Sequence, residues 1–235
     1  MDLISVIIPI YNQACVLRRS LVSLVNQSYR PIEIIIVNDG STDNFSEVIK
    51  NILAEEIFKE LKIKVINQPN QGAPAARNHG FSESTGSYVI FWDADTIAKP
   101  EMLAVMHQTL LSSANASWAY SQFCFGWKKM RGREFDVELL KKNNYIDVTS
   151  LIRSDAFLPF DENLKRFQDW DLWLTLIEQG KSGKFINKVL YKKITNPIGI
   201  SSWFPSFFFK LPWQTNKVKK YEVAKAIVLQ KHHLI

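Results

Sequence analysis

Apolar residues gather in four short runs along the first hundred positions, and segments with helical spacing separate them. The runs are nearly continuous and rich in β-branched residues, as in strands buried on both faces of a sheet. They cover residues 4–10, 32–38, 62–68 and 87–93, and the helical patterns cover 13–27, 44–61 and about 73–84. This alternation predicts an α/β fold: a mostly parallel, twisted sheet with right-handed crossovers and helices on both faces.

Polar segments follow three of the predicted strands. They are Pro9-Ile10-Tyr11-Asn12, residues 38–43 (NDGSTD) and Asp93-Ala94-Asp95. Ligands of parallel sheets bind outside the carboxyl ends of the strands, where the strand order reverses, so an order of 3-2-1-4 would make these segments line one crevice. The glycine signatures of dinucleotide sites and of P-loops are absent after the first strand, so neither kind of site explains the crevice.

Asp93 and Asp95 present two carboxylates one residue apart at the end of a strand. Hard cations such as Mg²⁺ and Mn²⁺ take oxygen ligands, and Mg²⁺ typically uses one or two protein carboxylates plus substrate phosphates. The pair therefore predicts a divalent cation that bridges the protein to a diphosphate. Structural alternatives stay open. The pair could form only an Asx-turn leading to a helix near residue 100, and NDGSTD could form only a turn, with Asn44 and Glu47 as a capping box.

Length and composition indicate one large domain, or one domain with an appendage: the chain has 235 residues, 46% hydrophobic and 22% charged. A strand-like run starts at once, without a basic or long apolar export signal, so a cytoplasmic location is expected. Cys15 and Cys124 stand far apart and predict neither a disulfide framework nor a thiolate zinc site. The four histidines lack metal-ligand spacing and are expected at the surface.

Positive charge is concentrated toward the C-terminus. From residue 181 onward there are 11 lysines against the single acid Glu222. This asymmetry favours an anionic surface such as acidic lipid or nucleic acid, with a solvated helix face as the alternative. The aromatic segment at 203–213 is too short to span a bilayer, so it either docks on protein or inserts at a membrane interface, next to a basic helix expected at about 217–231.

Five motifs occur together in an order that resembles family 2 glycosyltransferases of the GT-A fold, over residues 3 to about 195. They read SVIIPIYNQ, EIIIVNDGSTD, NQGAPAARNHG, YVIFWDADT and FQDWDLWLTLIEQG. The resemblance implies transfer of a sugar from a nucleotide donor, usually a UDP-sugar, to an acceptor hydroxyl with inversion, in glycan or polysaccharide synthesis. It also implies Mn²⁺ or Mg²⁺ as cofactor, a glycan or lipid-linked acceptor, no nucleic-acid partner, and a cytoplasmic or peripheral membrane location. An oligomer is compatible with it.

The same resemblance assigns site residues by position. It implies Asp93 and Asp95 as metal ligands, and its nucleotide-binding set is Pro9, Tyr11, Asn12, Asp39, Arg77 and Asp93. Arg77 could instead be a structural pin for the helix at 73–84, because an arginine suits both phosphate and carboxylate.

Asp169 resembles the general base of the family, which takes a proton from the acceptor hydroxyl. The alternative is that Asp169 and Asp171 only place negative charge in the first turn of a helix. The chain departs from the family pattern at Gln168, where Glu is common, at Asn38, where Asp is frequent, and at Thr96, where an acid is common. The slot in which the family often has a histidine falls near Thr195.

The resemblance divides the chain into a catalytic domain at 1–200, with a nucleotide-sugar half at 1–98 and an acceptor half at 99–200, and an appendage at 201–235. In the acceptor half, residues 117–125 are expected as a strand and residues 126–136 as a basic loop. Two other functions stay open. One is a non-catalytic binder of nucleotide sugars or glycans, and the other is a sugar-phosphate nucleotidyltransferase, which should have a glycine-rich loop soon after the first strand.

Overall fold

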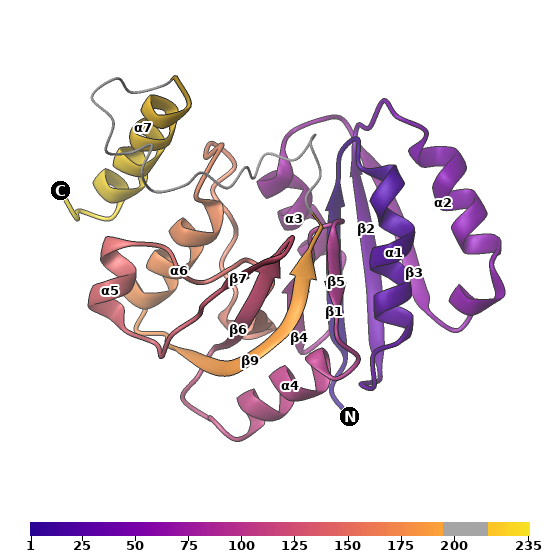
Figure 1. Cartoon of the computed structure of the whole chain (residues 1–235), viewed down its shortest axis with the longest axis horizontal. Helices are drawn as coiled ribbons and strands as arrows, with labels where there is room; N and C mark the ends of the chain where they lie inside the picture. Colours follow the sequence, from indigo (N-terminus) through magenta and orange to yellow (C-terminus); the bar gives the residue numbers. More distant parts are fainter. Residues whose placement is uncertain (195–215) are drawn as a thin grey trace.

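A computed structural model describes residues 1–194 and 216–235. Its described strands form one nine-stranded sheet in the order β3-β2-β1-β4-β8-β6-β9-β5, with β7 paired to β6 (Figure 1). The strands are β1 (Ile4–Ile10), β2 (Ile32–Asp39), β3 (Lys62–Gln68), β4 (Tyr88–Phe91), β5 (Thr96–Ala98), β6 (Trp118–Phe125), β7 (Lys128–Met130), β8 (Leu151–Arg153) and β9 (Gly183–Lys193). The helices are α1 (Ala14–Val25), α2 (Phe45–Ala54), α3 (Ala73–Ser82), α4 (Met102–Leu111), α5 (Val137–Lys142), α6 (Gln168–Glu178) and α7 (Asn216–Lys231), with short 3₁₀ turns η1 (Glu56–Phe58) and η2 (Ser154–Ala156).

The first four strands lie in the predicted order, 3-2-1-4, and all run parallel. Every residue of β1 and β2 is buried, which explains their continuous apolar sequences. Helices α1, α2 and α4 pack on one face of the sheet, and α3 and α6 on the other. The predicted α/β fold with helices on both faces is therefore confirmed.

One local prediction is wrong in part, and one structural alternative does not form. The helix expected at 44–61 ends at Ala54, because Glu55 takes an extended backbone with ψ of 135°, and η1 follows. Asn44 makes no side-chain cap; instead the Asp43 carboxylate accepts the backbone N–H of Phe45, so the capping box does not form.

Beyond β4 the sheet is mixed and curls. Strand β4 pairs antiparallel with β8, and β6 pairs antiparallel with β8 but parallel with β9. Only residues 92–95 separate β4 from β5, yet β5 pairs with the far side of β9. The sheet must therefore bend until β9 brings β5 back beside β4, and Figure 1 shows β9 as a long, curved strand. The predicted basic loop at 126–136 contains β7, which forms a hairpin with β6.

Helix α7 packs beside α6 at the end of the molecule away from α2 (Figure 1). Its Val228 is fully buried, and the predicted helix at about 217–231 is confirmed. The aromatic segment at 203–213 lies outside the described residues, so both interpretations of it stay predictions. Within residues 1–194 and 216–235, none of the helices combines the length and the apolar character that crossing a membrane requires.

Two histidines correct the expectation of surface positions. His107 and His232 are each only 7% exposed. The Nε2 atom of His107 lies 3.0 Å from the Asp2 carboxylate, and His232 lies between two carboxylates of α6, described below. Polar partners make such burial tolerable, and these partners are remote in the sequence.

Candidate functional site

A cleft of about 830 Å³ opens at the carboxyl ends of β1, β2 and β4. Its wall contains every residue that the sequence placed in the site: Pro9, Tyr11, Asn12, Asp39, Arg77, Asp93, Asp95 and Asp169. The prediction that the three polar segments share one crevice is therefore confirmed. The roles assigned to these residues stay predictions, and their contacts limit what each of them can do.

Asn12 ties two of the loops together. It has a left-handed backbone, with φ of 51°, and its Oδ1 accepts the backbone N–H groups of Thr42 and Asp43 at 2.7 and 3.2 Å. The amide oxygen is thus engaged within the protein, whereas the ring of Tyr11 stands half-exposed in the cleft wall. This geometry gives Asn12 a positioning role and leaves Tyr11 available for contact with a ligand.

Asp39 anchors the loop that leads into α3. One carboxylate oxygen accepts hydrogen bonds from the Gln68 side chain and the Gln71 backbone, and the other accepts from the Gly72 backbone, each at 2.8 Å. Gly72 itself has φ of 97°, a conformation that glycine adopts at little cost. The carboxylate therefore fixes one rim of the cleft.

Asp93 is fully paired with cations. Its Oδ1 lies 3.0 Å from Arg77 Nη2, and its Oδ2 lies 2.7 Å from the Nζ atom of Lys193, which also reaches Asp147 at 2.6 Å. Burial works against the charge of Asp93, but the Lys193 and Arg77 cations outweigh burial and hold the pKa of this carboxyl well below its usual range. Burial also opposes the charge of Lys193, and there the two carboxylates prevail and raise its pKa.

Asp95, unlike Asp93, forms no ion pair among the described residues. Its Oδ1 is buried and has no hydrogen-bond partner among the described residues. Burial, followed by the nearby charge of Asp93, raises the pKa of Asp95 well above its usual range. An oxygen that lacks a positive partner in this position fits a cation ligand. The described residues contain no group of three or more His, Cys, Asp or Glu side chains able to hold a metal ion alone, so a phosphate would have to complete the shell.

Asp169 lies in the first turn of α6, directly after Phe167 and Gln168. Its Oδ2 accepts a hydrogen bond from Asn144 Nδ2 at 2.8 Å. Burial raises the pKa of Asp169 to about 6, and the charge of Asp147 acts in the same direction. A carboxylate with this pKa is mostly ionised at neutral pH and can still accept a proton, which suits a general base.

Asp171, the alternative to Asp169, serves a different purpose. It is 2% exposed and does not line the cleft. Its Oδ1 lies 2.9 Å from His232 Nε2 and 2.8 Å from Lys231 Nζ, both at the end of α7. This carboxylate holds the C-terminal helix, and it is not placed to meet a ligand in the cleft.

The family described as Glycosyl transferase family 2 matches residues 5–204. The chain belongs to this family. An uncharacterized glycosyltransferase of Haemophilus influenzae is 36% identical over 162 residues, which are 67% of this chain and 60% of the relative. The chain thus spans three-fifths of the length of that relative.

Solved structures confirm the GT-A fold of this family 2 chain. The S. aureus TarS structure in complex with UDP aligns with a TM-score of 0.69 and 21% identity, covering 84% of this chain and 61% of that one. A mannosyltransferase from Pyrobaculum calidifontis, in complex with GDP-Man and Mn²⁺, aligns with a TM-score of 0.67 and 18% identity, covering 83% and 58%.

Lys193 and Asp147 are the principal cleft residues that the sequence reasoning missed. Lys193 stands in the basic run at the end of β9, where it was counted only as surface charge. Alternation along the strand was an available signal, because it puts Lys193 on the same face as Tyr191, and both are buried while Lys192 is exposed. Register explains the contact with Asp93, since Lys193 pairs with Thr96 across β5 and β9.

Arg77 combines both interpretations that the sequence left open. It lines the cleft, and it also joins Asp93 to α6 through a hydrogen bond from Nη1 to Gln168 Oε1 at 3.0 Å. Gln168 thus accepts a hydrogen bond from Arg77 at a position where the family commonly has Glu. The histidine slot near Thr195 lies outside the described residues.

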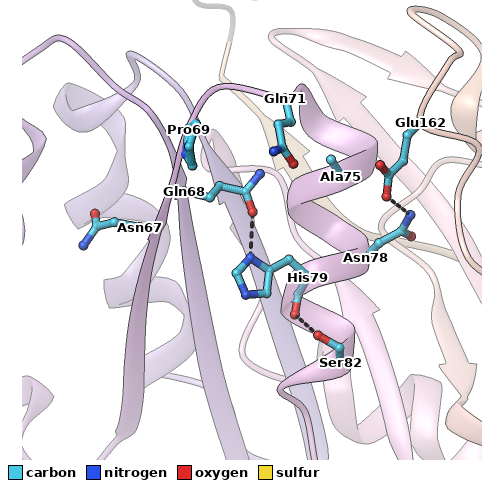
Figure 2. A pocket seen from close by; sticks show the side chains of 9 residues that line it. All are labelled: Asn67, Gln68, Pro69, Gln71, Ala75, Asn78, His79, Ser82 and Glu162. Carbon is cyan, nitrogen blue, oxygen red and sulfur yellow. Dashed lines mark hydrogen bonds between the residues drawn. The ribbon is translucent and has the colours of Figure 1, made fainter.

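A second, shallower groove of about 600 Å³ lies between β3 and α3 (Figure 2). Figure 2 shows His79 directed at Gln68, with 2.8 Å between Nδ1 and Oε1, and Asn78 bonded to Glu162. The predicted site residues do not line this groove. Because Gln68 also donates to Asp39, the groove is the outer side of the loop that frames the cleft.

Proposed function

We propose that this chain transfers a sugar from a nucleoside diphosphate donor, with a UDP-sugar as first candidate, to an acceptor hydroxyl with inversion. One observation carries the proposal: a carboxylate short of a cation, Asp95, and a carboxylate with the pKa of a base, Asp169, line the same cleft. Family 2 membership supports it. So do the ligands of structural neighbours, which are UDP-GlcNAc in TarS and GDP-Man in the archaeal mannosyltransferase.

Asp169 would act on the acceptor. As the acceptor oxygen attacks the anomeric carbon, its proton moves to the Asp169 carboxylate, and Asn144 keeps that carboxylate oriented. The new carbon–oxygen bond forms on the face opposite the leaving group. The bond from the anomeric carbon to the diphosphate breaks, and the nucleoside diphosphate leaves with the electron pair. A positioned base contributes about 10²–10⁴-fold to such a rate.

Asp95, with Asp93 beside it, would hold Mn²⁺ or Mg²⁺. When bound, the cation neutralises charge on the leaving diphosphate. Arg77 and Lys193 keep Asp93 ionised and in place, so that the carboxylate pair is ready for the cation and its substrate. Pro9, Tyr11, Asn12 and Asp39 would form the nucleoside end of the cleft, at the carboxyl ends of β1 and β2.

The division into a donor half at 1–98, an acceptor half at 99–200 and an appendage at 201–235 is part of this proposal. A glycan or lipid-linked acceptor, made or extended at the cytoplasmic face of a membrane, would fit the basic C-terminal region. Lysines near an anionic bilayer contribute about 1 kcal/mol each to attraction.

Separate roles for the aspartates give the decisive experiment. In calorimetry, wild-type protein should bind UDP tightly with Mn²⁺ and weakly in EDTA. Asp169→Asn should bind UDP with Mn²⁺ within twofold of wild type, while release of UDP from a panel of UDP-sugars with candidate acceptors should fall about 10²–10⁴-fold. Asp95→Asn should weaken both. Equal UDP affinity in Mn²⁺ and EDTA, or near-normal turnover by Asp169→Asn, would refute the assignment, and UDP binding without any turnover would favour a non-catalytic binder.

A further inference from the structure

Helix α7 forms part of the cleft wall. Its Tyr221 and Lys225 line the cleft together with Lys165 and Arg166, which lie just before α6. Figure 1 places α7 and α6 at the opposite end of the molecule from α2, whereas the nucleoside end of the cleft lies at β1 and β2. The residues of α7 therefore belong to the end of the cleft where an acceptor would enter.

Buried contacts fix α7 in this position. Val228 is fully buried against the core that also contains α6. His232 lies between two carboxylates of α6, with Nε2 2.9 Å from Asp171 and Nδ1 2.7 Å from Glu178. Lys231 adds an ion pair to Asp161 at 2.8 Å. Because α6 also carries Asp169, these contacts tie the position of Lys225 to that of the proposed base.

The cations of the cleft fall into two groups. Arg77 and Lys193 are paired with carboxylates, as described above. Among the described residues, no ion pair or hydrogen bond of the side chain of Lys165, Arg166 or Lys225 is present. Three cations from two separate segments thus line one end of the cleft without a carboxylate partner, which makes that end electropositive. Arg and Lys are the side chains that bind phosphate best, Arg through its planar fork.

We propose that the acceptor of this chain carries a phosphate group close to the attacked hydroxyl, and that Lys165, Arg166 and Lys225 recognise it. The inference rests on the proposed transferase function and names its substrate class. In the proposed function, Asp95 and a bound cation would account for the diphosphate of the donor, which leaves Lys165, Arg166 and Lys225 for the acceptor. The phosphate could belong to a lipid-linked glycan or to a soluble phosphorylated sugar or polyol, and the experiments below separate these sources.

A probe without any sugar tests the cluster directly. With the donor site filled by UDP and Mg²⁺, the full chain is acetylated at its lysines in the presence and absence of inorganic phosphate, and each site is followed by mass spectrometry. Phosphate should slow the modification of Lys225 and Lys165 at least threefold. Lys219 and Lys220, exposed on the same helix but outside the cleft, are matched controls and should not change. Equal rates with and without phosphate at Lys225 and Lys165 would overturn the proposal.

Matched ligands then test recognition. Wild-type protein with UDP and Mg²⁺ should bind glycosyl phosphates at least tenfold more tightly than methyl glycosides of the same sugars. Lys225→Glu and Arg166→Glu should each lose about tenfold of that preference, about 1.4 kcal/mol, whereas Lys219→Glu should keep it. A loss as large in Lys219→Glu would mean general surface charge and would overturn the proposal. So would an absence of preference in wild type.

A third experiment identifies the source of the phosphate. The same sugars are linked through diphosphate to a polyprenyl chain in neutral vesicles, and their binding is compared with that of the soluble glycosyl phosphates. Tighter, Lys225-dependent binding of the vesicle form assigns the phosphate to a lipid-linked acceptor, and equal binding assigns it to a soluble one. Lys225-dependent binding to phosphatidylglycerol vesicles without sugar would overturn the proposal in favour of a membrane surface. UDP affinity should be unchanged in all variants. If wild type fails to bind UDP while phosphate still protects Lys225, the transferase function fails and not the phosphate site.

Discussion

Replacing Asn144 should raise the pKa of Asp169 and thereby weaken the proposed base at neutral pH. Asn144 donates a 2.8 Å hydrogen bond to Asp169, which favours the ionised carboxylate. A bond to a charged acceptor contributes about 1.5–3 kcal/mol, and water in the cleft would replace part of it. A net loss of about 1.4 kcal/mol corresponds to about one pKa unit. Asn144→Ala should therefore move the pKa of Asp169 from about 6 to roughly one unit higher.

The sign of the effect fixes the expected pH profile. Because the ionised form is the base, donor turnover should fall as the pH drops through the pKa of Asp169, and the variant should lose activity at a higher pH than wild type. At pH 6.5 the ionised fraction would drop from about three-quarters to about one-quarter. Asn144→Asp should raise the pKa further, since it adds a second charge while it keeps the oxygen that accepts the Ile146 backbone N–H.

Carboxyl carbon NMR titration measures this pKa without a substrate, and Asp169→Asn identifies the signal. The order of midpoints should be wild type, then Asn144→Ala, then Asn144→Asp. Asn143→Ala is a matched control, because Asn143 is the exposed neighbour and its side chain makes no hydrogen bond to Asp169 among the described contacts. A midpoint unchanged in Asn144→Ala, or a shift as large in the control, would refute the reasoning.

Three further predictions concern stability. In EDTA, Asp95→Asn should raise the free energy of urea unfolding at pH 8 but not at pH 4. The raised pKa of Asp95 makes the folded wild type lose stability as the pH rises above the usual pKa of an aspartate. Mn²⁺ should raise the melting temperature of wild type and not of the variant. Two carboxylates raise the pKa of His232 despite burial, so its contribution to α7 docking should fade as the pH rises above that pKa. Hydrogen exchange of α7 amides, corrected for the intrinsic pH dependence of exchange, should show this loss in wild type and not in His232→Gln. Gly80→Ala should cost about 1–3 kcal/mol in urea unfolding, because a Cβ there would lie 2.4 Å from Ile7 Cγ2.

The part of the cleft at the ends of β1, β2 and β4 could be predicted because its information is local. Strands β1 and β2 are buried on both faces, so their sequences are continuous apolar runs that end at a polar segment. Parallel pairing then forces those ends to one edge of the sheet, which is why the residues chosen at the strand ends line one cleft. Arg77 and Asp169 lie on helices α3 and α6, and they were chosen from the family resemblance. Their individual partners were not predictable. The three backbone and side-chain donors around Asp39, for example, come from the end of β3 and the loop after it, about thirty residues later.

The rest of the chain depends on contacts between remote segments. Strand β5 has only three residues, too few for a periodic pattern, and its partner β9 lies almost a hundred residues later. His107 and His232 are buried because Asp2 and Asp171 face them, which no spacing in the sequence reveals. Net charge was also misleading for Lys193: a count of basic residues cannot distinguish a lysine in solvent from one that bridges two buried carboxylates.

Charge balance explains why the curl of the sheet matters for the proposed chemistry. Five carboxylates line the cleft, and four of them, from Asp93, Asp95, Asp147 and Asp169, form one interacting group around the carboxylate-paired cations Arg77 and Lys193. If β9 did not return to β5, Lys193 would not reach Asp93, and adjacent like charges would raise the pKa values of the neighbouring carboxyls further. With Lys193 in place, this group of four carboxylates and two cations is short of two positive charges, apart from Lys165, Arg166 and Lys225 at the other end of the cleft. A single divalent cation at Asp95 would neutralise that deficit and still leave Asp169 free to accept a proton.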